Sequence, residues 1–143
     1  MSLQKNKTFL KAGFTLLELL IVLSILALFA ALAGPQLIKY LSKAKAETAQ
    51  VQVNNLISAV ELYYLDTGRY PSKEGGLAAL LKDPGNVPRW NGPYLKKQDG
   101  LTDPWDHSYQ YRHPGQHGDF DIYSFGRDNA EGGEGEDKDI TSW

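Results

Sequence analysis

The chain has no cysteine among its 143 residues. This absence excludes disulfide bonds, thiol catalysis and cysteine-ligated metal sites. It does not identify the compartment, because a periplasmic protein can also do without disulfides. A small outer domain built from this chain must therefore be held together in some other way.

A basic surface is also missing. The formal net charge is −2, and the first 13 residues carry three lysines and no acid, so the remaining chain has 12 basic against 17 acidic residues. Phosphate binding needs a basic face, and no arginine-aromatic platform is present, so we expect no nucleic-acid partner. Six of the acids lie within residues 128–139, with Lys138 as the one base among them.

Catalytic motifs are absent as well. His107, His113 and His117 lie in turn-rich sequence, with no H-E-x-x-H helix and no paired acid at a useful spacing. Ser108 and Ser124 lack the strand–turn–helix context of a nucleophile elbow. We therefore expect turn or surface histidines and a protein that is not an enzyme.

One apolar segment, Phe14–Ala33, dominates the N-terminal part of the chain. As a helix, its 20 residues would span about 30 Å, which matches the hydrocarbon thickness of a bilayer. The lysines before it would remain cytoplasmic, so the rest of the chain would be translocated. Glu18 interrupts this segment, and a carboxylate costs roughly 2.5–3.5 kcal/mol at the bilayer centre and less near the interface. Glu18 is therefore a candidate functional residue that requires a partner.

Two simpler interpretations of the segment are open. It could be a secretory signal peptide cut after Ala33, at the sequence Ala31–Ala33, which would release a soluble calcium-binding domain that begins at Gly34. It could also be an uncleaved signal anchor. Glu18 argues against the cleaved signal peptide, since it is expensive in a segment meant only for removal. The helical periodicity also continues past the supposed cut.

The periodicity predicts one long helix over residues 14–66. Pro35 should loosen the helix locally without ending it, and Gly68–Pro71 should stop it. Beyond the apolar segment, apolar or small residues recur at alternating spacings of four and three, at Leu37, Leu41, Ala44, Thr48, Val51, Asn55, Leu56, Val60 and Tyr63. This stripe should be the face on which a C-terminal domain packs.

The C-terminal domain, residues 67–143, has the pattern of a small α+β domain. We expect a short helix over residues 74–82, a short strand over 94–96, and two strands over 109–112 and 120–125 that are joined by a turn. The predicted architecture is a small antiparallel sheet lying against the long helix.

The acidic segment 128–139 sets hard oxygen ligands on a glycine-rich backbone. Without a counter-ion its charges would repel one another, and composition alone favours a solvated acidic tail. With calcium, six to eight oxygens at about 2.3–2.6 Å could hold it. It is not an EF-hand, because Ala130 occupies a ligand position and the bidentate glutamate is missing.

The sequence Gly13-Phe14-Thr15-Leu16-Leu17-Glu18 resembles the N-terminal motif of the type IV pilin and pseudopilin family. The resemblance implies that residues 1–13 are a leader, that a prepilin peptidase cuts between Gly13 and Phe14, and that Phe14 is then N-methylated. It also implies that Glu18 remains in the mature chain. In an assembly of such helices, the new amine of one subunit can pair with Glu18 of a neighbour and set the register between them.

Further segments extend the resemblance over nearly the whole chain and are similar to the major pseudopilins of type II secretion systems. They are Gly68–Pro71, Gly76–Leu80, Gly92–Leu95, Asp103–Trp105, Pro114–Gly118 and Ile122–Asp128. Phe125 departs from the leucine that is common in this family. The resemblance implies a type IV pilin-like α+β fold, with a membrane-spanning and filament-core helix over 14–33, an amphipathic continuation over 34–66 and a C-terminal domain over 67–143.

The same resemblance implies a structural role. The chain would be the major subunit of a periplasmic pseudopilus that drives export of folded proteins across the outer membrane. It would be a single-pass inner-membrane protein with a periplasmic C-terminal domain, and its partners would be further copies of itself, minor pseudopilins, the inner-membrane secretion platform and the prepilin peptidase. The alternative within the family is a type IV pilin used in adhesion or DNA uptake.

The resemblance further implies calcium binding in the loop 125–140. Asp128 matches the first acidic ligand, and either Asp137 or Asp139 matches the later one. The backbone carbonyls of Phe125 and Ala130 would complete the shell. The glutamates of the loop would face solvent.

Overall fold

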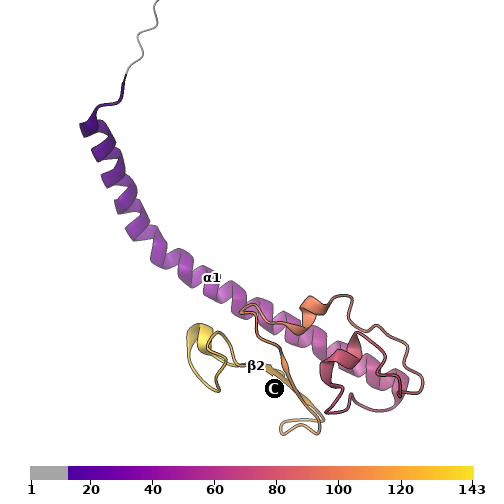
Figure 1. Ribbon diagram of the computed structural model, residues 1–143. Helices are drawn as coiled ribbons and strands as arrows, with labels where there is room; N and C mark the ends of the chain where they lie inside the picture. The colour runs from indigo at the N-terminus through magenta and orange to yellow at the C-terminus, as the bar shows by residue number, and fades with distance from the viewer. Residues whose placement is uncertain (1–12) are drawn as a thin grey trace, which may run out of the picture. The chain divides into compact units, whose positions relative to one another are not determined.

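The computed structural model describes residues 13–143 (Figure 1). Helix α1, Leu16–Thr67, runs without interruption through Pro35. The described residues fall into two units that divide between residues 38 and 39, and α1 begins in the first and ends in the second. The predicted long helix is therefore confirmed, and its bounds differ from the expected 14–66 by two residues at the start and one at the end.

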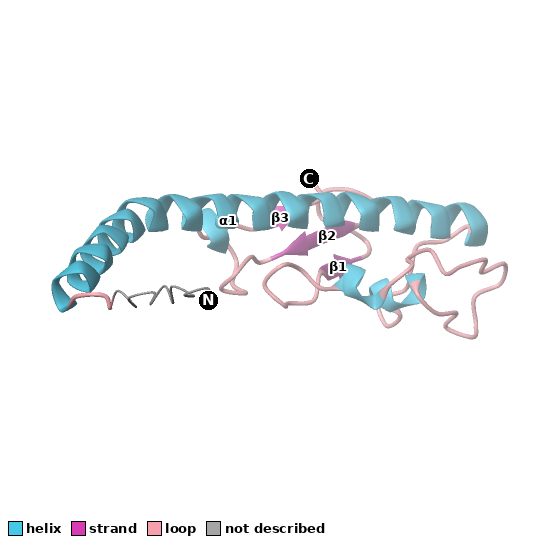
Figure 2. Cartoon of the chain, turned by 90° about the horizontal axis from the view of Figure 1, so that it is seen from above, coloured by secondary structure: helices cyan, strands magenta, loops and turns pink. Residues whose placement is uncertain are grey.

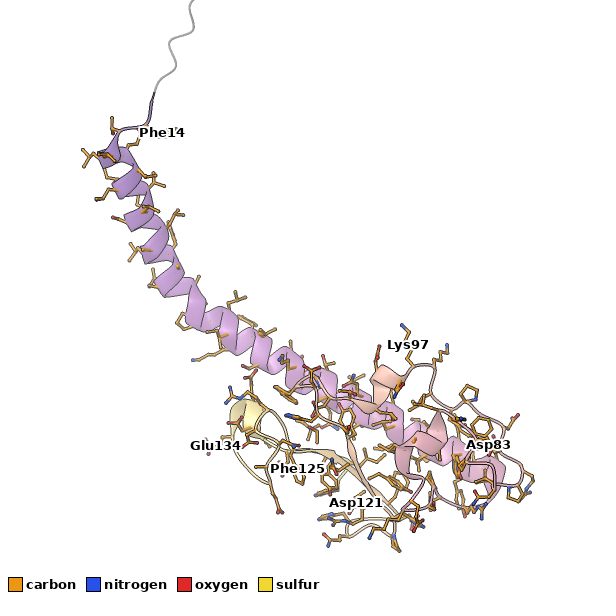
Figure 3. The ribbon with its side chains drawn as sticks, in the orientation of Figure 1. Phe14, Asp83, Lys97, Asp121, Phe125 and Glu134 are labelled. Carbon is orange, nitrogen blue, oxygen red and sulfur yellow. The ribbon has the colours of Figure 1, made fainter. Side chains whose placement is uncertain are left out.

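In the first unit, the apolar part of α1 is exposed to its surroundings. Every large apolar side chain of residues 14–32 is exposed, from 46% for Val22 to 88% for Leu16. Figure 3 shows these side chains projecting from all sides of the helix that begins just after the labelled Phe14. Within residues 13–143, α1 is the one helix long and apolar enough to cross a membrane.

In the second unit, α1 buries a stripe whose phase differs from the predicted one. The buried residues are Ala49, Val53, Leu56, Ala59, Val60, Tyr63 and Thr67. Leu56, Val60 and Tyr63 were predicted correctly, but Leu37, Leu41 and Val51 are more than half exposed. The buried face includes Ala49 and Ala59, because small side chains allow the C-terminal domain to pack closely against the helix. Leu37 and Leu41 are exposed because they lie before the part of the helix that this domain covers.

Gly68 ends α1. Its φ of +73° is a left-handed conformation that glycine adopts without a steric penalty, and its N–H donates to the Tyr64 carbonyl at 2.8 Å. The Thr67 hydroxyl closes the turn by donating to the Tyr63 carbonyl at 2.7 Å. The predicted stop at Gly68–Pro71 is confirmed.

The C-terminal domain contains a three-stranded antiparallel sheet in the order β1-β2-β3. The strands are β1, Gln110–Arg112; β2, Asp121–Ser124; and β3, Ile140–Thr141. Tyr111 faces Ile122 across the first pair, and Ser124 faces Ile140 across the second. The two predicted strands are confirmed in shortened form, and β3 was not predicted. Figure 2 shows the sheet beside the C-terminal part of α1.

The remaining elements are 3-10 helices. They are η1, Gly76–Leu80; η2, Gln98–Leu101; and η3, Gly135–Asp137. The helix expected over 74–82 is therefore a shorter 3-10 turn. The strand expected over 94–96 is wrong, because the N–H groups of Tyr94 and Leu95 both donate to the Leu80 carbonyl, at 2.7 and 3.2 Å, and form no ladder.

The core of this unit lies where α1, η1 and the sheet meet. Leu56, Leu80 and Ile122 come from the three elements and are fully buried. Burying a side chain of this size contributes about 1.5–3 kcal/mol relative to exposure. Tyr109, just before β1, is linked to α1, because its hydroxyl donates to Gln52 Oε1 at 2.7 Å. Burial raises the pKa of Tyr109 far above its ordinary value, so this hydroxyl keeps its proton.

Candidate functional site

The N-terminal motif begins where the described chain begins. Gly13 and Phe14 lie just before α1, and Phe14 is 83% exposed. The predicted leader is residues 1–13, and all of it except Gly13 lies outside the described residues. The Thr15 hydroxyl oxygen accepts a hydrogen bond from the Glu18 N–H at 3.1 Å and so caps the first turn of α1. Glu18 itself is exposed in that first turn.

The acidic loop starts where β2 ends, at Ser124, and returns to β3 at Ile140. Figure 3 labels Phe125 at its base and Glu134 within it. Gly126, with φ of +69°, allows the two ends to meet. A Cβ atom there would lie 2.7 Å from the Glu136 carbonyl oxygen and 2.9 Å from that of Lys138, so only glycine fits without a shift.

Arg127 binds the returning end of the loop. Its Nε and one terminal nitrogen donate to the two oxygens of Asp137 at 2.8 and 3.0 Å, and its other terminal nitrogen donates to Glu136 at 3.0 Å. The Asp137 carboxylate, and to a smaller extent that of Glu136, raises the pKa of Arg127. Both oxygens of Asp137 are thus engaged by a guanidinium, which makes Asp137 a poor candidate for a metal ligand.

Asp139 is different, because one of its oxygens has no partner. Oδ2 accepts a hydrogen bond from the Gly132 N–H at 3.0 Å, whereas Oδ1 is buried and unpaired within the described residues. Asp139 also lines a hollow of about 120 Å³ together with Phe125 and Glu131, and Arg112 and His117 line the same hollow. A buried carboxylate oxygen without a partner is costly, and a hard cation is one group that would satisfy it.

Asp128 and Ala130 lie in the exposed outer part of the loop. Asp128 Oδ1 accepts a hydrogen bond from the Ala130 N–H at 3.2 Å. Among residues 13–143, no group of three or more His, Asp or Glu side chains is placed to hold a metal ion. The calcium ligands predicted from the sequence are only two carboxylates, together with two backbone carbonyls. Asp139 fits that set better than Asp137.

The three histidines are engaged in turns. His107 and His113 contact the carbonyls of Gly126 and Asp119 through Nδ1, at 3.0 and 2.9 Å. His117 Nδ1 lies 3.4 Å from Asp121 Oδ2, and the His117 ring stacks on Trp143 with centroids 3.8 Å apart.

Sequence reasoning missed two features of this region. One is the pairing of Arg127 with Asp137, for which the only signal is an arginine just before an acidic segment. The other is the hydrogen bond between the Ser124 hydroxyl and buried Asp103, which joins residues 21 apart and leaves no local pattern.

Comparison with known proteins covers almost the whole chain. The family described as "Type II secretion system (T2SS), protein G" matches residues 36–143, and the prokaryotic N-terminal methylation motif matches residues 9–34. The chain belongs to the type II secretion system protein G family. The resemblance seen in the sequence is therefore confirmed.

Curated members of the protein G family support this assignment. The type II secretion system core protein G of Pseudomonas aeruginosa is 42% identical over 137 residues, which are 93% of this chain and 95% of that protein. The core protein G of Vibrio cholerae is 38% identical over 136 residues, covering 93% and 92% of the two chains.

A solved pseudopilin structure supports the fold. The crystal structure of the major pseudopilin from the type 2 secretion system of enterohaemorrhagic Escherichia coli matches with a TM-score of 0.60 and 34% identity. The match covers 71% of this chain and 85% of that one. The predicted α+β class, with one long helix and a small antiparallel sheet, is confirmed.

Proposed function

We propose that this chain is the major structural subunit of a type II secretion pseudopilus, which polymerises through its N-terminal helix to drive export of folded proteins across the outer membrane. One observation carries the proposal. The segment over residues 14–33, helical from Leu16 on, is apolar and exposed on all sides, with Glu18 as its single charged side chain. Such a surface is stable in lipid or against further copies of itself.

The pairing of charges gives this helix a defined register in a filament. Cleavage before Phe14 creates an α-amino group four residues from Glu18 along the chain. A carboxylate buried among apolar helices attracts an ammonium strongly, because the dielectric there is low. The amine of one subunit and Glu18 of its neighbour would then lower the cost of burying both charges.

The proposed location follows from the same segment. The helix spans the inner membrane once, with the lysine-rich leader cytoplasmic and residues 39–143 periplasmic. The prepilin peptidase processes the chain, and the inner-membrane platform and minor pseudopilins assemble it. Family membership and the match of the methylation motif to residues 9–34 support these partners.

The proposal is tested by deleting the coding sequence in its native host and complementing it with the wild-type chain. Deletion should block release of exoproteins into the medium and leave surface pili in place, and the wild-type chain should restore release. Normal exoprotein release with loss of surface pili would instead assign the chain to an adhesion or DNA-uptake pilus.

We further propose that the acidic loop binds calcium through Asp128, Asp139 and the carbonyls of Phe125 and Ala130. Support comes from the buried Oδ1 of Asp139, which is unpaired within residues 13–143. Asp137 is the weaker candidate, because Arg127 already binds both of its oxygens. Bound calcium would neutralise the clustered carboxylates and take the structural role that a disulfide has elsewhere.

Isothermal titration and thermal melts test the calcium proposal. Calcium should bind and raise the melting temperature, and a chelator should reverse the rise. Asp139→Asn should abolish most of the effect, whereas Asp99→Asn, at an exposed residue of η2, should retain it. An unchanged melt with chelator, together with no heat of binding, would refute the proposal.

A further inference from the structure

A buried carboxylate outside the acidic loop is bound to the residue that begins the loop. Asp103 is 4% exposed and Ser124 is 1% exposed. The Ser124 hydroxyl donates to Asp103 Oδ2. Asp103 Oδ1 accepts the N–H groups of Trp105 and His107, both at 2.9 Å. With three donors around it, Asp103 is held in one orientation as an acceptor, and it fixes the rotamer of Ser124.

The Ser124 hydroxyl oxygen also accepts a hydrogen bond, from the Gly126 N–H at 3.0 Å. This N–H shares a planar trans peptide group with the Phe125 carbonyl. In a trans peptide the C=O and N–H bonds point in opposite directions. Holding the Gly126 N–H on Ser124 therefore turns the Phe125 carbonyl away from Ser124.

The next peptide group is held as well. His107 Nδ1 contacts the Gly126 carbonyl at 3.0 Å, and since a carbonyl only accepts, this nitrogen carries the hydrogen. On the other side of the same peptide, the Arg127 N–H donates to the Glu136 carbonyl at 2.8 Å. Two successive peptide planes at the loop base are thus fixed by the turn 103–107 and by the returning end of the loop.

We propose that Asp103 and Ser124 are positioning residues that aim the Phe125 carbonyl at the loop's calcium ion. The proposal rests on the calcium proposal above. Neither side chain is a ligand, because the Ser124 hydroxyl and both Asp103 oxygens are already engaged in hydrogen bonds. The two residues act through the orientation of one peptide group, as outer-shell partners do in other metal sites.

The test compares calcium affinity in full-length Ser124→Ala and wild-type chains in detergent, by isothermal titration at a temperature where both are folded. Ser124→Ala should bind calcium about tenfold or more weakly, the range found for lost outer-shell partners. Ser108→Ala changes an exposed serine that forms a β-bridge with Thr102 before β1; it is the matched control and should bind like wild type. Thermal melts of both chains in chelator measure any loss of stability that Ser124→Ala causes without calcium, and so separate a structural role from an effect on calcium binding.

Asp103→Asn is the second variant, because it keeps the side chain's shape but weakens its hold on the Ser124 hydroxyl. It should also bind calcium more weakly. If Ser124→Ala does not fold, the calcium affinity of Asp103→Asn relative to wild type decides the question. Affinities within twofold of wild type would overturn the positioning role and leave the calcium site standing. A wild-type chain that takes up no calcium would overturn both.

Discussion

At the scale of single residues, Glu18 carries the largest functional weight. It is exposed in the first turn of α1, where its N–H donates to the Thr15 hydroxyl oxygen, and its carboxylate has no partner within residues 13–143. A charge near the end of a membrane helix is favourable only when an opposite charge approaches it in the assembled state. Its role should therefore appear in assembly rather than in folding.

The first prediction concerns Glu18→Gln, which removes the charge and keeps the shape. Membrane insertion should persist, because a neutral amide is less costly in lipid than a carboxylate. Filament yield and exoprotein release should fall at least tenfold, since the neighbour's amine loses its partner. Glu47→Gln is the control, because Glu47 is an exposed helix residue whose pairing with Lys43 is worth only about 0.3–0.5 kcal/mol. Normal filaments from Glu18→Gln would contradict the pairing.

Asp121 gives a prediction about pH. Burial alone raises the pKa of this carboxyl, but the N–H groups of Gln116 and His117 and the His117 ring outweigh burial and lower it below its ordinary value. The Asp121 carboxylate therefore takes up its proton at a higher pH in the unfolded chain, at about 3.9, than in the folded chain. The stability from Asp121 is present above that pH and is lost as pH falls through the folded pKa.

Melting temperatures measured from pH 6 down to pH 3 test this sign. Asp121→Asn should flatten the loss of stability below about pH 4, since its side chain has no proton to take up. Asp99→Asn, exposed and far along the sequence, should keep the wild-type slope. Equal slopes for Asp121→Asn and the wild-type chain would show that the carboxylate is not stabilised as described.

At the scale of elements, the acidic loop depends on its close approach at Gly126. An alanine there would place Cβ 2.7 Å from the Glu136 carbonyl oxygen. Gly135 has a similar positive φ, +62° against +69°, but a Cβ atom there meets nothing within 4 Å. The two glycines thus separate backbone strain from crowding.

We predict that Gly126→Ala lowers the free energy of unfolding by about 1–3 kcal/mol more than Gly135→Ala does, the usual range for overpacking. Chemical denaturation of both variants measures the difference. If Gly135→Ala were equally destabilising, positive φ alone would account for the effect, and the closure of the loop over Gly126 would have no energetic role.

The elements also show what the sequence can and cannot predict. The long helix followed from an apolar run and a continuing 3.6-residue period, and Gly68 supplied its end. The buried stripe was misplaced at Val51, because periodicity alone cannot tell which neighbouring face the domain covers. Strand β3 has two residues, too few for alternation to be visible. The Asp103–Ser124 contact depends on tertiary packing, and so does the choice between Asp137 and Asp139.

At the scale of the whole molecule, the two units place different demands on their surroundings. Residues 39–143 have a core of their own, made by α1, η1 and the sheet. The apolar helix of the first unit has no such cover, since its large apolar side chains are all exposed. A chain with this division must keep its apolar helix in a bilayer or among copies, which is what a filament subunit requires.

The central claim is that the mature protein keeps the apolar helix and Glu18, and mass spectrometry of the N-terminus tests it most directly. Protein purified from its native host should begin at Phe14 and carry one methyl group on its amine. A mature chain beginning at Gly34 would contradict the account, because the helix that builds the filament would have been removed.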